Sequence, residues 1–167
     1  MAQAQGGPTA PVPPVRLAGL STNPTALSRQ LAALARAADN ATKPSSQPTY
    51  NEIEAIWAQQ PVPPKLQAAF LRVLATIPNL RDLGSTTDRV GRPGRAVGFD
   101  TTSDGAVTRQ IIILDPSTGA PLGEEQILLS DPHHMSQWSV IPIHVPAVVD
   151  YTAYLASAHV PTVHSTS

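Results

Sequence analysis

Apolar residues in the first half of the chain recur every three or four positions, which is the period of an amphipathic helix. The clearest stripe lies in residues 21–41 and consists of Leu27, Leu31, Leu34 and Ala38. Asn23 before Pro24 is typical of a helix start, because asparagine caps free amides and proline lacks the donor that is unused there. Two shorter helices are predicted over residues 50–60 and 65–76, separated by a proline-rich break.

The third predicted helix carries its own apolar stripe, formed by Leu66, Phe70, Val73 and Leu74. A helix of about a dozen residues is not stable alone in water, so this stripe must pack against another element. We expect that element to be the following sheet, with Phe70 buried, because consecutive elements are usually neighbours. In the second helix we expect Glu52 and Glu54 in the first turn, where the helix dipole favours anions.

Beyond Pro78 the apolar period changes from helical to two, and turn signals recur at short intervals. Six strands are predicted, over residues 80–87, 95–101, 107–114, 122–129, 138–143 and 148–156. The third contains the run Ile111, Ile112 and Ile113, which favours a buried central strand. The segregation of helices from strands predicts an α+β fold, with about three N-terminal helices packed on one face of an antiparallel five- or six-stranded meander.

The elements form one domain with a tail at each end. We expect residues 1–20 to be a disordered tail rich in proline, alanine and glutamine, and residues 158–167 to be flexible. The single domain would cover residues 21–157, with helices in 21–76 and the sheet in 79–157. The large aromatic residues are expected in the helix–sheet core: Trp57, Phe70, Trp138, Tyr151 and Tyr154.

Composition excludes several classes of protein. The chain has 167 residues, a net charge of −1 and 4% aromatic residues, which argues against a nucleic-acid binder. It has no cysteine, so it has neither a disulfide nor a thiol nucleophile. No run of about 18 apolar residues is present, so no membrane span is expected within this sequence.

Histidines near the C-terminal end are the first candidates for chemistry. His133 and His134, with Asp131, offer metal-ligand atoms. Adjacent residues on a strand point to opposite faces, however, and no pair of histidines has the helical i, i+4 spacing. We therefore expect neither a metal nor a cofactor, and a metal-dependent hydrolase using these three residues is kept as the alternative.

Charged residues of the predicted hairpins are the second candidates. Arg89, Arg92 and Arg95 would form a cationic rim able to contact an anionic partner, although aspartates are interleaved with them. Glu124 and Glu125 alternate across the sheet and so are not expected to act together. No carboxylate pair is predicted for acid–base catalysis.

Several short motifs, taken in order, carry a resemblance to a known family. They are NPTAL at 23–27, IW at 56–57, PPKLQAAF at 63–70, LATIPN at 74–79, TDRVGRPG at 87–94, LDPSTGAPLGEE at 114–125 and YTAYL at 151–155. Their order and spacing resemble an uncharacterised family of actinomycete envelope proteins with one membrane anchor and a C-terminal extracytoplasmic domain. The layout is similar to periplasmic lipoprotein carriers and to sensor domains that bind anti-sigma factors.

The resemblance and the missing catalytic constellation together predict a function. We expect a non-catalytic extracytoplasmic binding or sensor-type domain of a bacterial cell envelope, with a protein or an apolar small molecule as partner. The resemblance implies membrane association through an upstream anchor. If Met1 is the native start, the chain would instead be a cytoplasmic scaffold.

Overall fold

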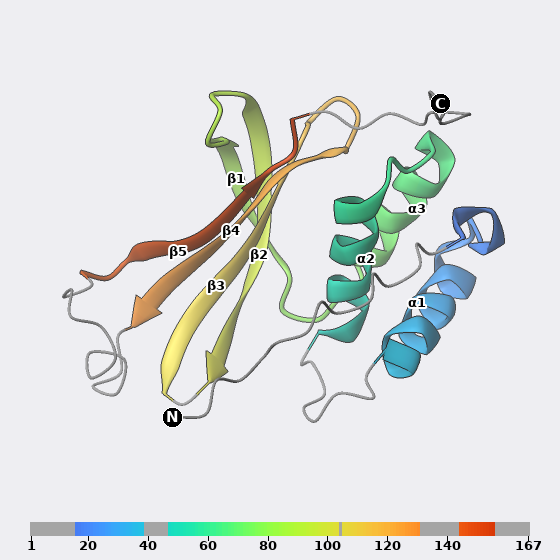
Figure 1. Ribbon diagram of the computed structural model, residues 1–167, viewed down its shortest axis with the longest axis horizontal. Coiled ribbons are helices and arrows are strands. Elements are labelled where there is room, and N and C mark those ends of the chain that lie inside the picture. Colours follow the sequence, from blue (N-terminus) through green and yellow to red (C-terminus); the bar gives the residue numbers. More distant parts are fainter. Residues whose placement is uncertain (1–15, 39–46, 104, 131–143, 156–167) are drawn as a thin grey trace, which may run out of the picture.

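The computed structural model describes residues 16–38, 47–103, 105–130 and 144–155, and these residues form three layers (Figure 1). A 3-10 turn, η1 (Leu17–Gly19), precedes three helices: α1 (Pro24–Ala38), α2 (Pro48–Gln59) and α3 (Pro64–Leu74). The helices α2 and α3 lie beside the sheet, and α1 packs against both of them on the side away from the strands. The predicted α+β class is therefore confirmed.

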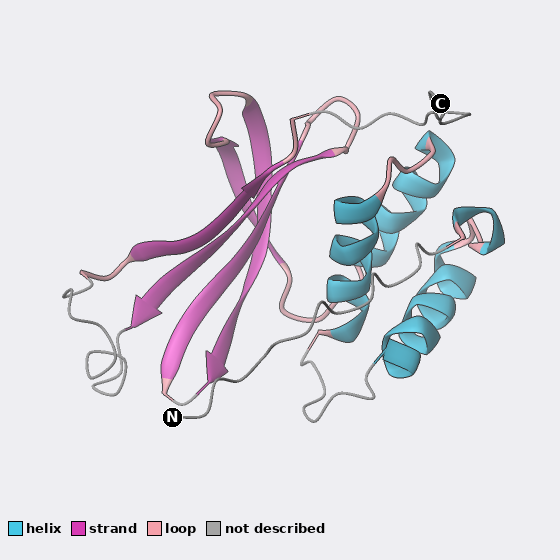
Figure 2. Cartoon of the chain, viewed as in Figure 1, coloured by secondary structure: helices cyan, strands magenta, loops and turns pink. Residues whose placement is uncertain are grey.

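The sheet is an antiparallel meander in which each strand pairs with the next along the chain. Its strands are β1 (Arg81–Thr87), β2 (Pro93–Ser103), β3 (Ala106–Leu114), β4 (Pro121–Ser130) and β5 (Ala147–Ala153). The register places Val97 opposite Ile112, and Ile112 opposite Glu124. Directly paired residues share a sheet face, so these three side chains lie on one face, which is the face toward the helices because Ile112 and Val97 pack in the core with them. Figure 2 shows the helices gathered on one side of the sheet.

The main core fills the space between the helices and this face of the sheet. It joins apolar residues of every helix to Phe99, Ile112 and Leu114. Phe70 is fully buried, as predicted, and its ring meets that of Trp57 edge to face at a centroid distance of 6.0 Å. Tyr50 and Phe99 make a similar contact at 4.7 Å, which attaches α2 to β2.

A second, smaller cluster covers part of the opposite sheet face. It contains Ala96, Ile111, Ile113 and Leu122, with Leu83 and Ile127 packed against it. The three consecutive isoleucines therefore serve two cores, since Ile112 points to the helices and its neighbours point away. All three are buried, which confirms the predicted central strand.

Several details differ from the sequence-based expectations. The helix α2 begins at Pro48 rather than near Tyr50, because proline suits the first helical turn, and no acidic residue lies in that turn. Glu52 and Glu54 are therefore not dipole-stabilising residues. Leu17 and Leu20, inside the predicted tail, pack partly buried against the main core.

The end of the sheet also differs. Tyr151 is not a core residue: it lies on the outer face of the edge strand β5 and is 59% exposed. The last strand ends at Ala153 rather than at residue 156. The predicted strand 138–143, with Trp138, lies outside the described residues, which form five strands. Among those residues, no helix is long and apolar enough to cross a membrane.

Candidate functional site

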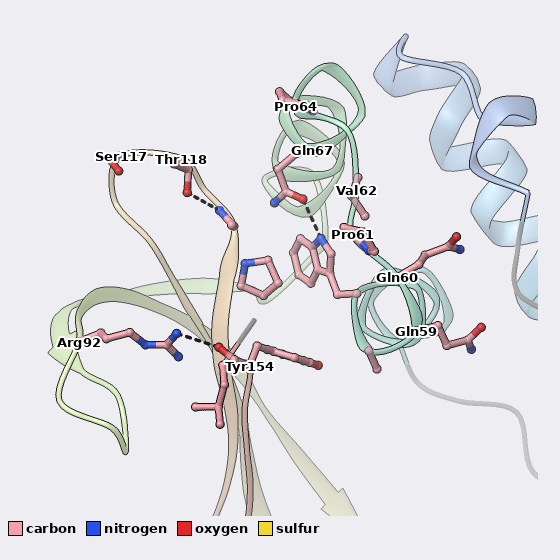
Figure 3. Close-up of a pocket in the computed structure, with 15 residues that line it drawn as sticks. Gln59, Gln60, Pro61, Val62, Pro64, Gln67, Arg92, Ser117, Thr118 and Tyr154 are labelled. Atoms are coloured by element: carbon pink, nitrogen blue, oxygen red, sulfur yellow. Dashed lines mark hydrogen bonds between the residues drawn. The ribbon is translucent and has the colours of Figure 1, made fainter. Parts of the chain in front are cut away.

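A groove of about 860 Å³ opens between the corner joining α2 to α3 and the ends of strands β3, β4 and β5 (Figure 3). One wall comes from the end of α2, the following turn and the start of α3, with Trp57, Ala58, Gln59, Gln60, Pro61, Val62, Pro64 and Gln67. The other wall comes from the sheet, with Arg92, Ser117, Thr118, Ala120, Pro121, Tyr154 and Leu155. Segments far apart in sequence thus meet only in the folded chain.

A hydrogen-bonded latch joins the two walls at the back of the groove. The indole N–H of Trp57 donates to Oε1 of Gln67 at 2.8 Å (Figure 3). The amide nitrogen of Gln67 in turn donates to the carbonyl of Gly119. Gly119 has a φ of 70°, and a Cβ there would lie 2.3 Å from Cδ1 of Leu71. The turn between β3 and β4 therefore docks closely on α3 because this position has no side chain.

The predicted rim residue Arg92 is built into the sheet side of the groove. Its Nε donates to the buried carboxylate of Asp88 at 2.6 Å. Its two terminal nitrogens donate to the carbonyls of Tyr154 at 2.7 Å and Leu122 at 2.6 Å. The guanidinium group of Arg92 thus joins the β1–β2 turn to β4 and to the segment after β5. Each of its three nitrogen atoms donates a hydrogen bond to an oxygen atom of the protein.

The carboxylate of Asp88 accepts several hydrogen bonds within the β1–β2 turn. Its carboxylate also accepts hydrogen bonds from the backbone amides of Val90 at 3.1 Å and Arg92 at 2.7 Å. Burial by itself raises the pKa of Asp88, but the backbone and side-chain hydrogen bonds from Arg92 outweigh it, so the net shift is downward. Asp88 is therefore ionised at neutral pH, and its hydrogen bonds fix the turn.

The other two predicted rim arginines lie away from the groove, each beside a carboxylate. Arg89 bonds both oxygens of Glu125, at 2.7 and 3.2 Å, and its guanidinium lies 5.8 Å from the ring centre of Tyr151. Arg95 pairs with Asp82 across β1 and β2. Only Arg92 of the three lines the groove. Contact between these arginines and an anionic partner stays a prediction.

Two hydroxyl groups of the groove make local hydrogen bonds. The hydroxyl of Ser117 donates to Asp115 at 2.6 Å, and Oγ1 of Thr118 accepts from the amide of Ala120 at 3.2 Å. The described lining residues include no histidine and no carboxylate. Hydrogen bonds from Ser117 and Thr118 lower the pKa of the Asp115 carboxyl to about 2, so this carboxylate is a weak base toward the Ser117 hydroxyl. The described lining residues of the groove therefore combine apolar surface with neutral polar side chains and one arginine.

A second feature, which the sequence analysis missed, is a pair of carboxyl groups between α2 and β4. Glu54 and Glu124 are both half-buried and interact through their side chains. Burial and the neighbouring charge of Glu124 raise the pKa of Glu54 to about 8, and burial also raises the pKa of Glu124. At neutral pH the pair therefore carries a proton, and one carboxyl hydrogen-bonds to the other.

Two tyrosines flank this carboxyl pair. The hydroxyl of Tyr154 donates to Oε1 of Glu124 at 2.5 Å. Tyr50 lies one helical turn before Glu54 and is 1% exposed, and its hydroxyl interacts with the side chain of Glu54. Burial raises the pKa of Tyr50 above its usual range, and the nearby carboxylates raise it further, so the hydroxyl group stays protonated. The only sequence signal for this site was the helical spacing of Tyr50 and Glu54.

The predicted metal candidates His133, His134 and Asp131 lie outside the described residues. Within the described residues, no group of three or more histidine, aspartate or glutamate side chains is arranged to hold a metal ion. The hydrolase alternative therefore stays a prediction.

Comparison with known proteins identified no relative of this chain. No protein-family model matches the chain, and no curated protein or solved structure shows significant similarity to it.

Proposed function

We propose that this chain is a non-catalytic binding domain, and that the groove beside Trp57 receives a small neutral ligand with an apolar body. The observation that carries this proposal is the groove itself. Its volume of about 860 Å³ falls within the range of about 300–1,000 Å³ that is usual for small-molecule sites. Its lining mixes apolar side chains with a few neutral polar ones, as such sites do.

Rigidity supports a binding role. Pro61, Pro64 and Pro121 lie on the rim, and proline restricts the backbone in both bound and free states. The latch through Gln67 holds the indole of Trp57 in place. A preformed site loses little conformational entropy when it binds a ligand. The ligand class follows from the lining, because the only cation there, Arg92, already donates to protein acceptors.

The extracytoplasmic location belongs to the same proposal. It is supported by the resemblance of the motifs between residues 23 and 155 to envelope proteins. In that setting the domain would act as a carrier or sensor of its ligand.

A neutral fluorescent probe tests the groove directly. N-phenyl-1-naphthylamine should bind saturably to the intact chain, with increased emission. Ala58 is exposed and lines the groove, whereas Ala55 is exposed on the same helix but does not line it. Ala58→Phe should therefore abolish binding, and Ala55→Phe should leave it unchanged. Equal binding by both variants would contradict the assignment of the groove.

A further inference from the structure

The chain that leads to the C-terminal segment is attached to the wall of the groove. Tyr154 and Leu155, which come directly before residues 156–167, both line the groove (Figure 3). The backbone of Tyr154 is held on both sides, because its N–H donates to the carbonyl of Leu122 at 2.9 Å and its carbonyl accepts from Arg92 at 2.7 Å. The point at which residues 156–167 begin is therefore fixed at the groove.

Leu155 adds apolar surface at this point. Its side chain is 74% exposed, more than any other large apolar side chain in the described part of the chain. Because Leu155 is itself a lining residue, its exposed carbon atoms and the apolar walls of the groove belong to one surface. A segment that lay in the groove would remove apolar area of both from water, which is favourable.

The sequence that follows Leu155 matches the groove in charge and polarity. Residues 156–163 read ASAHVPTV and contain no aspartate, glutamate, lysine or arginine. Ala156, Val160, Pro161 and Val163 provide small apolar side chains. The described lining residues include no carboxylate, and the cation of Arg92 already donates to protein oxygens. A neutral, apolar segment therefore fits this lining without leaving a charge unpaired.

Chain length also favours this segment over the proline-rich segment near the other end. Eight extended residues span about 26 Å, well beyond the spacing of about 10 Å between packed layers, so residues 156–163 can cross the groove. Residues 8–15 are also neutral and apolar, but they join the described chain at Arg16. Neither Arg16 nor η1 lines the groove.

We propose that residues 156–163 occupy the groove of their own chain and compete with its ligand, an inference that rests on the proposed function. A directly attached segment has an effective concentration of about 1 mM, so a segment whose free peptide binds with a Kd of about 0.1 mM fills the groove about nine-tenths of the time and weakens a competing ligand about tenfold. Ligand binding then displaces the segment, which gives a sensor domain its output.

Variants of the full chain test the competition. Val160→Asp combined with Val163→Asp places two charges in the neutral groove, so N-phenyl-1-naphthylamine should bind this variant about tenfold more tightly than the wild type. Ser165→Asp combined with Ser167→Asp makes the same change in charge outside residues 156–163, and its probe affinity should equal that of the wild type. Circular dichroism of each variant confirms folding.

A second measurement needs no probe. The chain has no cysteine, so Ser165→Cys carries a single nitroxide label. The label should broaden the amide signals of Gln60 and Thr118, two lining residues on opposite walls of the groove. Adding Ala58→Phe, which fills the groove, should reduce this broadening, whereas Ala55→Phe on the same helix should leave it unchanged.

Two results would overturn the inference while the groove keeps its proposed function. One is wild-type probe affinity in the Val160 and Val163 double variant, with binding still abolished by Ala58→Phe. The other is label broadening that Ala58→Phe does not change. If no variant binds the probe but Ala58→Phe still reduces the broadening, the small-ligand function is contradicted and the docked segment is supported.

Two further results would assign the groove to another occupant and so also overturn the inference. Tighter probe binding after Pro11→Asp and Pro13→Asp, but not after the changes at Val160 and Val163, would assign it to the proline-rich segment. Probe affinity that falls as the protein concentration rises would assign it to a segment of a second copy of the chain.

Discussion

Glu54 of α2 and Glu124 of β4 place their carboxyl groups against each other in the helix–sheet interface, where a proton links them. Glu124 of β4 lies opposite Ile112 of β3 in the sheet. The carboxyl group of Glu124 is therefore next to Ile112, which belongs to the main apolar core. The contact joins the middle of α2 to the sheet through a titratable bond. The attachment of the helix should therefore depend on pH.

The free energy of unfolding should fall as the pH rises through the carboxyl pair. The folded protein holds the proton of Glu54 more tightly than the unfolded chain, whose pKa is near 4.5. The stabilisation is therefore complete below about pH 4.5 and is lost progressively up to about pH 8. Urea unfolding at a series of pH values measures this change.

Glu54→Gln isolates the contribution of the pair. A glutamine can donate a hydrogen bond at every pH, so the variant should lose most of the decline between about pH 5 and pH 8. Glu52→Gln, on the same helix, should retain most of it. If the two variants show the same decline as the wild type, the carboxyl pair does not control stability.

Arg92→Ala should destabilise the fold by about 2–4 kcal/mol, because it leaves the buried carboxylate of Asp88 and two carbonyls without their donor. Arg95→Ala breaks only the exposed pair with Asp82 and should cost about 0–1 kcal/mol. Chemical unfolding at neutral pH compares the two. Similar losses for both variants would mean that Arg92 does not join the strands.

Phe70→Ala should destabilise the protein by about 3–5 kcal/mol, because it removes a fully buried ring from the centre of the main core. Amide exchange should also show strong protection of residues 66–75 without any ligand. Leu155→Ala provides the control, since Leu155 is largely exposed and should change stability little. Rapid exchange of α3 that slows only when a ligand is added would refute the packed helix.

Gly119→Ala should destabilise the turn between β3 and β4 for two reasons. The φ of 70° costs about 1–2 kcal/mol for a residue with a Cβ. The new methyl group would also press on Cδ1 of Leu71, 2.3 Å from the Cβ position. Thermal unfolding measures the loss.

Leu71→Ala supplies the test of that contact. It removes the atom on which the new methyl group presses, so the double variant should lose less stability than the sum of the two single variants. Strict additivity would mean that the backbone conformation alone accounts for the cost at Gly119.

The positions of helices and the central strand could be predicted because their signals are local. The stripes around Leu31 and Phe70, the cap at Asn23 and the isoleucine run in β3 each act within a few residues. In the structure the side chain of Asn23 accepts from the amide of Ala26 at 3.1 Å, as a cap does. Predictions at element ends were less accurate, since α2 starts at Pro48.

The candidate sites could not be predicted in the same way. Tyr151 and Tyr154 have similar chemistry and nearly the same place in sequence, yet one is mostly exposed and the other bonds Glu124 inside the fold. The difference depends on the sheet face toward which each side chain points: Tyr151 lies on the outer face of β5, and Tyr154, just beyond the end of β5, points to the face that carries Glu124. A shift of one residue in strand register would exchange those faces.

The order and type of the elements and most of the apolar core follow from local sequence patterns, because periodicity and turn chemistry are properties of short segments. Folding of the whole chain is what brings Glu54 to Glu124, joins Arg92 to the carbonyls of Leu122 and Tyr154, and opens a groove beside Trp57. Each of these depends on strand register and on which helix covers which strand. Those are relations between distant segments, and they are set by packing the whole chain at once.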